Sequence, residues 1–309
     1  MKKTIYIHIG TEKTGTKTIQ FFCAEYNEYL KKCGLFYPFD RNKEYMLNTT
    51  HWPLAASLAK NNNFVPQDKR MEPEILFDLL KEDINKTNMN KILISAEPFS
   101  VYVTDIKKIN QIKDLLSSYT VKIIIYLRRQ DDYFVSLTST NIKGGNTFGK
   151  INVESVLTDS NRYDYYALLK KWSDVFGKDS IIVRRFEKQA FKNNNLLDDF
   201  FDIFGIDVKE YSNAFSIYNP SLSLDSLLFL KQINEMYKLE QSARTKLYTR
   251  LEQYESPYSS KNIITYEDRE KIIKHYEDSN DRVLKEFIDD GSKYLFKETL
   301  RELFLGMKY

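Results

Sequence analysis

A loop rich in threonine and lysine follows the first apolar run of the chain. It spans residues 10–18, reads Gly-Thr-Glu-Lys-Thr-Gly-Thr-Lys-Thr, and is followed at once by residues at helical spacing. A loop between a strand and a helix presents backbone N–H groups and the positive end of the helix dipole, which together bind phosphate-like anions. The segment therefore predicts an anion-binding loop; the alternative is a tight turn that uses Gly15 only for its backbone freedom. The residues expected to bind the anion are Lys13, Thr14, Gly15, Thr16, Lys17 and Thr18.

The lysine of this loop is in the wrong register for a Walker A motif. That motif has a lysine directly after its second glycine, but Thr16 follows Gly15 here and Lys13 lies inside the loop. Magnesium-dependent nucleotide chemistry also uses an aspartate at the end of a second strand, where this chain has Glu97 and Arg128. We therefore expect a phosphate cradle without a metal ion. A P-loop small-molecule kinase that uses ATP and magnesium is the alternative function.

Four short runs of β-branched and aromatic residues predict the strands that position this loop. Segments with helical spacing separate them, and after residue 220 only helical patterns remain. This alternation predicts an α/β fold of the three-layer P-loop type, with a central, mostly parallel sheet flanked by helices and a helical C-terminal region. We expect a single domain over residues 1–309, with a nucleotide-binding core at 1–220 and a helical extension at 221–309. The predicted strands are Thr4–Ile9, Lys91–Ala96, Val121–Leu127 and Ser180–Val183.

The composition limits the partners and the compartment. Because 46 Lys and Arg face 43 Asp and Glu, no broad basic surface for nucleic acid is expected. No apolar stretch approaches the ~20 residues of a membrane span, and no secretion signal is evident, so we expect a cytoplasmic protein. Cys23 and Cys33 fall on one predicted helix, about 15 Å apart, which is too far for a disulfide. His8 is expected in the interior and His275 at the surface.

Two motifs resemble the PAPS-dependent sulfotransferases, specifically their bacterial carbohydrate-type members. The first is Lys13-Thr14-Gly15-Thr16 after a strand, and the second is the segment Arg128–Ser136, which leaves another apolar strand and enters a helix. The resemblance implies that the loop grips the 5′-phosphosulfate of 3′-phosphoadenosine 5′-phosphosulfate (PAPS), and that Arg128 and Ser136 hold its 3′-phosphate. It also implies sulfuryl transfer, without a metal, to a hydroxyl or amine of a glycan or glycolipid in polysaccharide biosynthesis. The Arg-Lys-Gly loop of the soluble eukaryotic branch does not occur in this sequence, so a third contact to the 3′-phosphate is not predicted.

The chemistry of the second motif is compatible with a phosphate contact. An arginine at the carboxyl end of a strand and a serine one to two helical turns later can converge on one phosphate, which the guanidinium grips with two hydrogen bonds. Ligands of open α/β sheets bind at these strand ends. The alternative is that Arg128 forms a surface ion pair with Asp131 or Asp132.

Glu97 and His51 are the two candidates for the general base, since the resembled family uses either a glutamate or a histidine. Glu97 ends a predicted strand at the same sheet edge as the loop, and partial burial there would raise its pKa toward the working pH. His51 is the alternative because its unperturbed pKa already suits base catalysis. Lys13 is expected to stabilise the leaving phosphate, with help from Lys17.

Overall fold

The computed structural model describes residues 2–59, 70–146, 151–215 and 221–297. The chain separates into two compact units. The first comprises Met1–Arg128, Asp164–Ser216 and Ser279–Leu295, and the second comprises Arg129–Tyr163, Ile217–Asp278 and Phe296–Tyr309. The single domain with a boundary at residue 220 stays a prediction.

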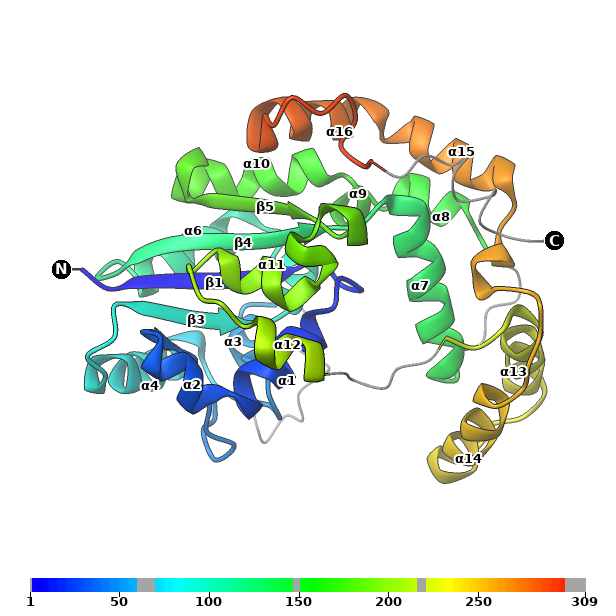
Figure 1. The fold of residues 1–309 in the computed structure, drawn as a ribbon, viewed down its shortest axis with the longest axis horizontal. Helices are drawn as coiled ribbons and strands as arrows, with labels where there is room; N and C mark the ends of the chain where they lie inside the picture. Colours follow the sequence, from blue (N-terminus) through cyan, green and yellow to red (C-terminus); the bar gives the residue numbers. More distant parts are fainter. Residues whose placement is uncertain (1, 60–69, 147–150, 216–220, 298–309) are drawn as a thin grey trace. The chain divides into compact units, whose positions relative to one another are not determined.

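A five-stranded sheet forms the centre of the first unit (Figure 1). Its strand order is β2-β3-β1-β4-β5, and every neighbouring pair is parallel. The expected α/β fold with a parallel central sheet is therefore confirmed. The edge strand β2 was not predicted, because two residues are too short a run to show a pattern. The strands are β1 (Thr4–Gly10), β2 (Leu35–Phe36), β3 (Lys91–Ser95), β4 (Thr120–Leu127) and β5 (Ile181–Arg185).

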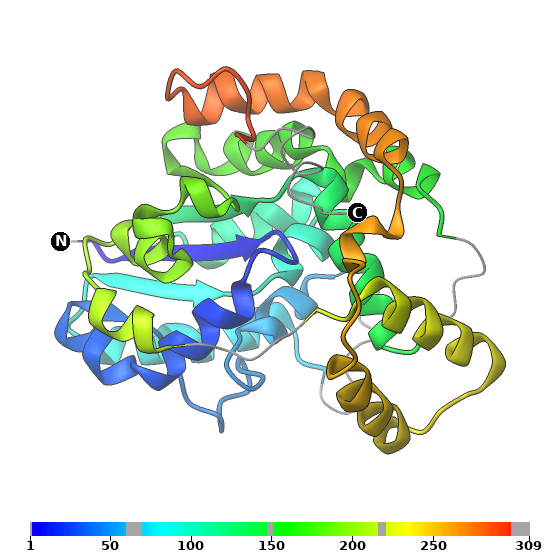
Figure 2. The same cartoon turned by 45° about the vertical axis from the view of Figure 1, so that its right-hand side comes forward.

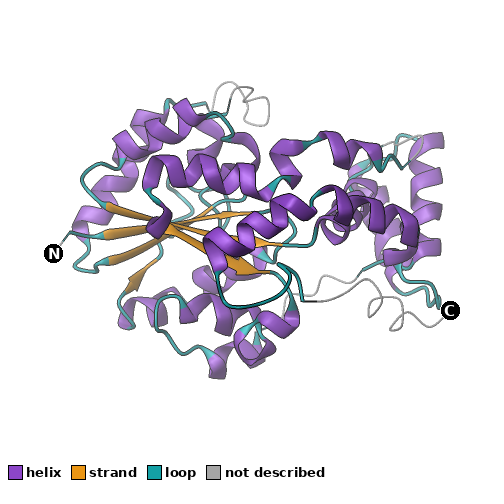
Figure 3. Cartoon of the chain, turned by 90° about the horizontal axis from the view of Figure 1, so that it is seen from above, coloured by secondary structure: helices purple, strands orange, loops and turns teal. Residues whose placement is uncertain are grey.

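Helices cover both faces of this sheet (Figure 3). Ile124 and Tyr126 of β4 pack into a core cluster with apolar residues of α1 and α11, while Ile123 and Ile125 alternate to the opposite face. All four side chains are fully buried, as expected for a central strand of a parallel sheet. The helices of this unit are α1 (Thr16–Glu25), α2 (Asn27–Lys32), α3 (Trp52–Ser57), α4 (Pro73–Lys86), α5 (Pro98–Tyr102), α6 (Ile106–Leu115), α10 (Tyr165–Phe176), α11 (Leu196–Asp202) and α12 (Lys209–Ala214).

The described part of the second unit is built from helices (Figure 2). Tyr133 and Phe134 of α7 pack with Ile272 and Tyr276 in one apolar cluster, and Leu227 and Leu230 of α13 lie in another. The helical pattern predicted after residue 220 is confirmed for the described residues. These helices are α7 (Gln130–Lys143), α8 (Glu154–Thr158), α9 (Ser160–Tyr163), α13 (Leu224–Met236), α14 (Gln241–Glu252) and α15 (Tyr266–His275); α16 (Glu277–Val283) runs across the boundary between the units.

The helix predicted across both cysteines is interrupted, so that prediction was wrong. Tyr26, with φ −102° and ψ 28°, ends α1 and precedes α2. Cys23 is buried on α1, Cys33 is exposed just after α2, and both thiols are free. In the described ranges no helix combines the length and apolar character needed to cross a bilayer.

Candidate functional site

The strand order brings three polar chain segments to one edge of the sheet. Strand β1 lies between β3 and β4, so the loop of residues 10–18 is flanked by the segments that follow these two strands. Glu97 follows β3 and Arg128 follows β4. The N–H of Thr11 donates to the carbonyl of Tyr126 at 3.0 Å, which ties the loop to the end of β4. The carboxyl ends of β3, β1 and β4 therefore form the candidate site.

The backbone of the loop turns through two left-handed residues, Lys13 with φ 64° and Gly15 with φ 71°. This conformation is uncommon for a residue with a side chain and costs of order 1 kcal/mol or more, so the surrounding contacts must hold it. The hydroxyl of Thr14 donates to the carbonyl of Thr11 at 2.6 Å, which braces the turn. Helix α1 begins at Thr16, directly after Gly15 as its N-cap, so its first N–H groups lack helical partners.

Gly15 is required for space as well as for its backbone angle. A Cβ atom at this position would lie 2.3 Å from Cδ2 of Leu196 and 3.2 Å from Cε2 of Phe186. The first distance is far below any van der Waals contact. The start of α1 therefore packs directly under the β5–α11 segment, and the tight-turn explanation accounts for only part of the glycine's role.

The remaining loop side chains differ in exposure. Thr16 is buried, and its hydroxyl acts on the Glu97 carboxylate, whose pKa it lowers. Lys17 is exposed, and Thr18 is half-buried on the first turn of α1. The hydroxyl groups of Thr16 and Thr18 thus lie on the first turn of α1, which also carries the free backbone N–H groups.

Charged groups around the loop act on one another. Burial lowers the pKa of Lys13, and Glu97 opposes this shift. The positive charges of Lys17 and Arg128 lower the pKa of Lys13 further, and Glu12 raises it. For Glu97, burial raises the pKa first and the carboxylate of Glu12 second, while Lys13 and Lys17 oppose them. The structure thus brings Lys13, Lys17, Glu97 and Arg128 into one electrostatic environment.

Glu97 is the N-cap residue of α5, but its side chain makes no capping hydrogen bond. It is only partly buried, and a Cβ on Gly10 would lie 3.3 Å from its Cα, so the ends of β1 and β3 approach closely there. A carboxylate with a raised pKa at this position is suited to accept a proton near neutral pH.

Arg128 reaches the loop directly. Its Nη1 donates to the carbonyl oxygen of Lys13 at 3.0 Å, and its guanidinium lies 5.6 Å from the ring centre of Phe186. The hydroxyl of Tyr165 donates to the backbone carbonyl of Arg128. These contacts hold the arginine at the edge of the loop, half-buried.

His51 is placed as an interior residue. Its ring is fully buried, its Nδ1 accepts from the N–H of Ser95 at 3.2 Å, and its Nε2 lies 3.2 Å from the carbonyl of Pro38. Burial lowers the pKa of His51 to about 3. With both ring nitrogens occupied by backbone groups, His51 is less suited than Glu97 to accept a substrate proton.

His8 and His275 lie where the sequence predicted. His8 is fully buried, and its Nδ1 lies 2.9 Å from Oγ of Ser95. Burial lowers the pKa of His8 to about 3. His275, at the end of α15, is exposed. The interior and surface predictions for these two residues are confirmed.

Ser136 belongs to the second unit, on α7. Its side chain is half-buried, and its carbonyl accepts a hydrogen bond from the hydroxyl of Thr140 at 2.9 Å. Its convergence with Arg128 on one phosphate stays a prediction.

The aspartates that follow Arg128 belong to a buried ion cluster. Asp131 bonds to Nε of Arg129 at 2.7 Å and also to Nη1 of Arg269, which in turn contacts Asp132 at 3.0 Å. Burial by itself would raise the pKa of Asp131, but the two arginines lower it below its ordinary value. Asp131 and Arg269 are fully buried, so Asp131 belongs to a buried ion cluster with Arg129 and Arg269. The alternative that Arg128 pairs with Asp131 or Asp132 stays untested.

Sequence reasoning missed two residues of the site, Glu12 and Phe186. Glu12 lies within the predicted loop, and its acidic charge next to Lys13 was the available signal. Phe186 directly follows β5, so its place at a strand end was a weaker signal. Its contacts with Gly15 and Arg128 depend on folding and leave no trace in the local sequence.

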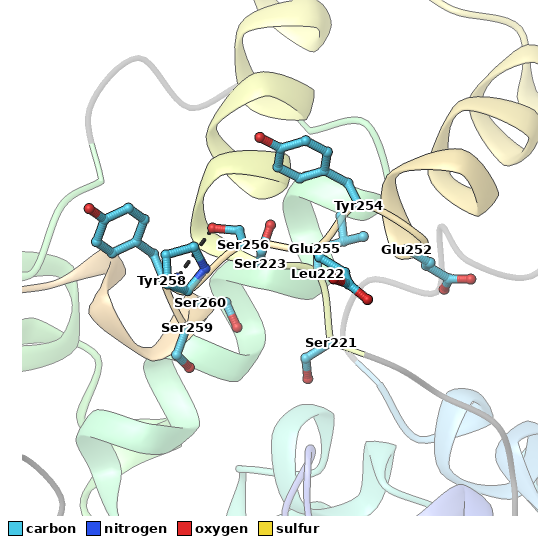
Figure 4. A pocket seen from close by; sticks show the side chains of 11 residues that line it. Ser221, Leu222, Ser223, Glu252, Tyr254, Glu255, Ser256, Tyr258, Ser259 and Ser260 are labelled. Carbon is cyan, nitrogen blue, oxygen red and sulfur yellow. Dashed lines mark hydrogen bonds between the residues drawn. The ribbon is translucent and has the colours of Figure 1, made fainter. Parts of the chain in front are cut away.

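An open cavity of about 730 Å³ lies within the second unit (Figure 4). Serines, two tyrosines and two glutamates line it. Several of these serines have local roles: Ser223 caps α13, and Ser256 accepts from the N–H of Tyr258. All of its lining residues belong to the second unit, and the cavity is given no role in the proposed chemistry.

Comparisons with known proteins place few constraints on this site. No family model matches the chain. The chain is 28% identical over 209 residues to an uncharacterized protein of Archaeoglobus fulgidus, and the alignment covers 67% of this chain and 56% of that protein. The chain thus spans about half the length of the curated relative that it matches. A solved sulfotransferase structure from Alicyclobacillus acidocaldarius is similar with a TM-score of 0.45 and 15% identity, over 79% of this chain and 100% of that chain.

Proposed function

We propose that this chain is a sulfotransferase that uses PAPS as its donor. The observation that supports this best is the contact between Arg128 and the carbonyl of Lys13. It joins two motifs that lie 115 residues apart in the sequence, each of which the resemblance assigns to one end of the same nucleotide. Both lie at the carboxyl edge of a parallel sheet, where ligands of such folds bind.

The residues of the loop suit the phosphosulfate end of the donor. The first N–H groups of α1 and the ammonium of Lys13 supply the positive field that an anion needs. The buried Thr16 hydroxyl, on the first turn of α1, can donate to the same anion. Arg128, with Ser136 as the further proposed contact, would hold the 3′-phosphate.

In the proposed reaction, an acceptor hydroxyl oxygen forms a bond to sulfur while the bond between sulfur and the bridging phosphate oxygen breaks. Glu97 takes the hydroxyl proton, which its raised pKa favours. Lys13 stabilises the negative charge that develops on the leaving 5′-phosphate. The products are the sulfated acceptor and adenosine 3′,5′-bisphosphate. The step needs no metal ion.

The proposed acceptor is a glycan or glycolipid that presents a hydroxyl or an amine. This part of the proposal rests on the resemblance to carbohydrate-type members and on the role in polysaccharide biosynthesis that it implies. A cytoplasmic location is proposed with it. A panel of glycans incubated with sulfur-labelled PAPS tests it directly. Label in a glycan, or in the sugar part of a glycolipid, with none in protein acceptors, would support the carbohydrate class.

A thermal-shift comparison separates the sulfotransferase from the kinase alternative. We expect adenosine 3′,5′-bisphosphate to raise the melting temperature without magnesium, because ligand binding to the folded state stabilises it. The Lys13→Ala variant should lose this shift, while exposed Lys107→Ala, on α6, should keep it. Stabilisation by ATP only when magnesium is present, with no effect of the bisphosphate, would favour the kinase instead.

A further inference from the structure

A buried amide on α1 connects the helix that follows the 10–18 loop with the segment that carries Glu97. We propose that Gln20 is a positioning residue that holds the backbone before Glu97 in place for proton transfer. Gln20 is 5% exposed and lies on α1, which begins within the loop. The inference rests on the proposed sulfotransferase function, in which Glu97 is the base.

The amide of Gln20 is bonded to Ser95, the last residue of β3. Its Nε2 donates to Oγ of Ser95 at 3.1 Å and to the carbonyl oxygen of Ser95 at 3.3 Å. The same Nε2 lies 3.3 Å from Oγ1 of Thr50, which itself donates to the carbonyl of Ser95 at 3.1 Å. Ser95 is fully buried and lies two residues before Glu97. The amide therefore fixes the backbone from which Glu97 projects.

Two buried histidines bind the same serine. The N–H of His51 donates to the carbonyl of Ser95 at 3.0 Å, and the N–H of Ser95 donates to Nδ1 of His51 at 3.2 Å. Nδ1 of His8 lies 2.9 Å from Oγ of Ser95. Burial lowers the pKa of both histidines to about 3, so they stay neutral near pH 7. Gln20 brings α1 into this network and so links the end of β3 to the loop.

A second side chain on the same face of α1 acts on Glu97 itself. Thr16 and Gln20 are four residues apart, which places them on one face of the helix about 6 Å apart along its axis. The buried hydroxyl of Thr16 acts on the Glu97 carboxylate, and the amide of Gln20 holds the backbone that precedes it. Because the first turn of α1 belongs to the proposed phosphosulfate site, the helix sets the distance between the base and the donor.

Asn27 offers a matched comparison, since it is a second buried amide on the following helix, α2. It is 9% exposed, and its Nδ2 donates to the carbonyls of Tyr37 at 2.9 Å and Cys23 at 3.3 Å. Loss of either amide leaves buried carbonyl groups with fewer donors and should lower the melting temperature. We expect Glu97 to be displaced only when the amide of Gln20 is lost.

Steady-state kinetics of four proteins test the role: wild type, Gln20→Met, Glu97→Gln and the double variant. Gln20→Met keeps the length of the side chain and removes the amide. It should lower kcat about 10- to 100-fold, because a misplacement of ~1 Å can cost this much, and should leave the dissociation constant of adenosine 3′,5′-bisphosphate unchanged. In the Glu97→Gln background the same change should not lower kcat further, since no base remains to be positioned. Asn27→Leu is the control and should keep the wild-type kcat.

Two kinetic results would overturn the positioning role: the same kcat in Gln20→Met and wild type, or equal losses in both backgrounds. Carbon-13 NMR titration of the Glu97 carboxyl gives a readout that needs no turnover. If Gln20→Met releases Glu97 from its buried position, its pKa should fall toward the ordinary value, because burial is the main cause of the increase. An unchanged pKa would contradict the inference. A wild type without sulfuryl transfer would refute the proposed function, and the titration would still decide whether Gln20 holds Glu97.

Ser95→Ala is the second variant if Gln20→Met does not fold by circular dichroism. It removes the hydroxyl to which the Gln20 amide donates and keeps the backbone carbonyl. We expect kcat to fall about threefold or more, with unchanged binding of the bisphosphate. A wild-type kcat in Ser95→Ala would contradict the role of this network.

Discussion

Arg128 and Arg129 are neighbours in the sequence but belong to very different surroundings. Arg128 is half-buried and donates to the carbonyl of Lys13 in the anion-binding loop. Arg129 is 5% exposed and bonds to Asp131, which also binds Arg269. The first arginine belongs to a candidate site, and the second to a structural ion cluster.

The two regions differ in how their charges are balanced. In the cluster, two arginines face two aspartates at bonding distance. Around the loop, the cations Lys13, Lys17 and Arg128 act against the carboxylates of Glu12 and Glu97, and the start of α1 adds further positive potential. A positive excess at a sheet edge suits an anionic ligand, whereas a balanced buried cluster suits stability. Variants in the two regions should therefore fail in different assays.

The largest effect is expected for Lys13→Ala. Loss of the ammonium beside the leaving phosphate should lower kcat/KM for sulfuryl transfer by about 10³-fold or more. The melting temperature should stay near that of wild type, since alanine keeps the Cβ atom at this left-handed position. Steady-state kinetics with labelled PAPS give the rate. Near-normal turnover would remove Lys13 from the mechanism.

Arg269→Met should damage stability instead of nucleotide binding. It leaves the buried Asp131 with only one of its two arginines, and breaking such a buried ion pair costs about 3–5 kcal/mol in the free energy of unfolding. Urea denaturation followed by circular dichroism measures this loss. A wild-type unfolding curve would show that the cluster contributes little to stability.

Arg128→Ala should show the opposite pattern to Arg269→Met. Loss of a charged hydrogen-bond donor should weaken binding of adenosine 3′,5′-bisphosphate about 10- to 100-fold, with little change in unfolding. Isothermal titration calorimetry measures the dissociation constant. Arg184→Ala, on β5 in the same unit, is the control. An unchanged dissociation constant in Arg128→Ala would separate Arg128 from the nucleotide.

Glu12→Gln should shift the pH dependence of the rate. The negative charge of Glu12 raises the pKa of Glu97, so its removal lowers that pKa. A base with a lower pKa stays ionised to lower pH, and the acid limb of kcat/KM should move down by up to about one pH unit. Glu12→Asp retains the charge and should keep the wild-type limb. A limb that does not move in Glu12→Gln would argue against Glu97 as the base.

The smallest expected effect is on thermal stability, because ionised Glu97 destabilises the folded protein. Because the pKa of Glu97 is higher in the folded protein than in the unfolded chain, folding favours its protonated form. The stabilising contribution is present below the unfolded pKa and is lost as the pH rises through the folded pKa. Glu97→Gln should therefore melt about 1–3 °C above wild type at pH 8 and show no difference at pH 3. Calorimetry measures the melting temperatures of both proteins at the two pH values. A Glu97→Gln variant that melts below wild type at pH 8 would contradict the raised pKa.

The layout of the sheet was largely predictable, whereas its irregular features were not. Each of the four longer strands is rich in β-branched residues, and the helices between them imply parallel pairing. The break at Tyr26 was missed because the apolar spacing continues through it. The two-residue strand β2 exists only through its pairing with β3, which no local pattern encodes.

The site was predictable where it depends on strand ends. Lys13, Glu97 and Arg128 each follow a strong strand signal, and parallel strands bring such positions to one edge. Partners distant in the sequence could not be predicted. Arg269 lies 138 residues from Asp131, and their buried contact was not predicted. The burial of His51 likewise depends on Ser95 and Pro38, which are assembled by the fold.

The close packing at Gly15 links the evolution of two distant positions. With Leu196 Cδ2 only 2.3 Å from the position of a Cβ atom, a methyl group at residue 15 requires the side chain at residue 196 to move or to be smaller. Among descendants of a common ancestor, the two positions should therefore change together or remain fixed together. The conformation of the loop at residues 10–18 therefore constrains which residues can occupy position 196.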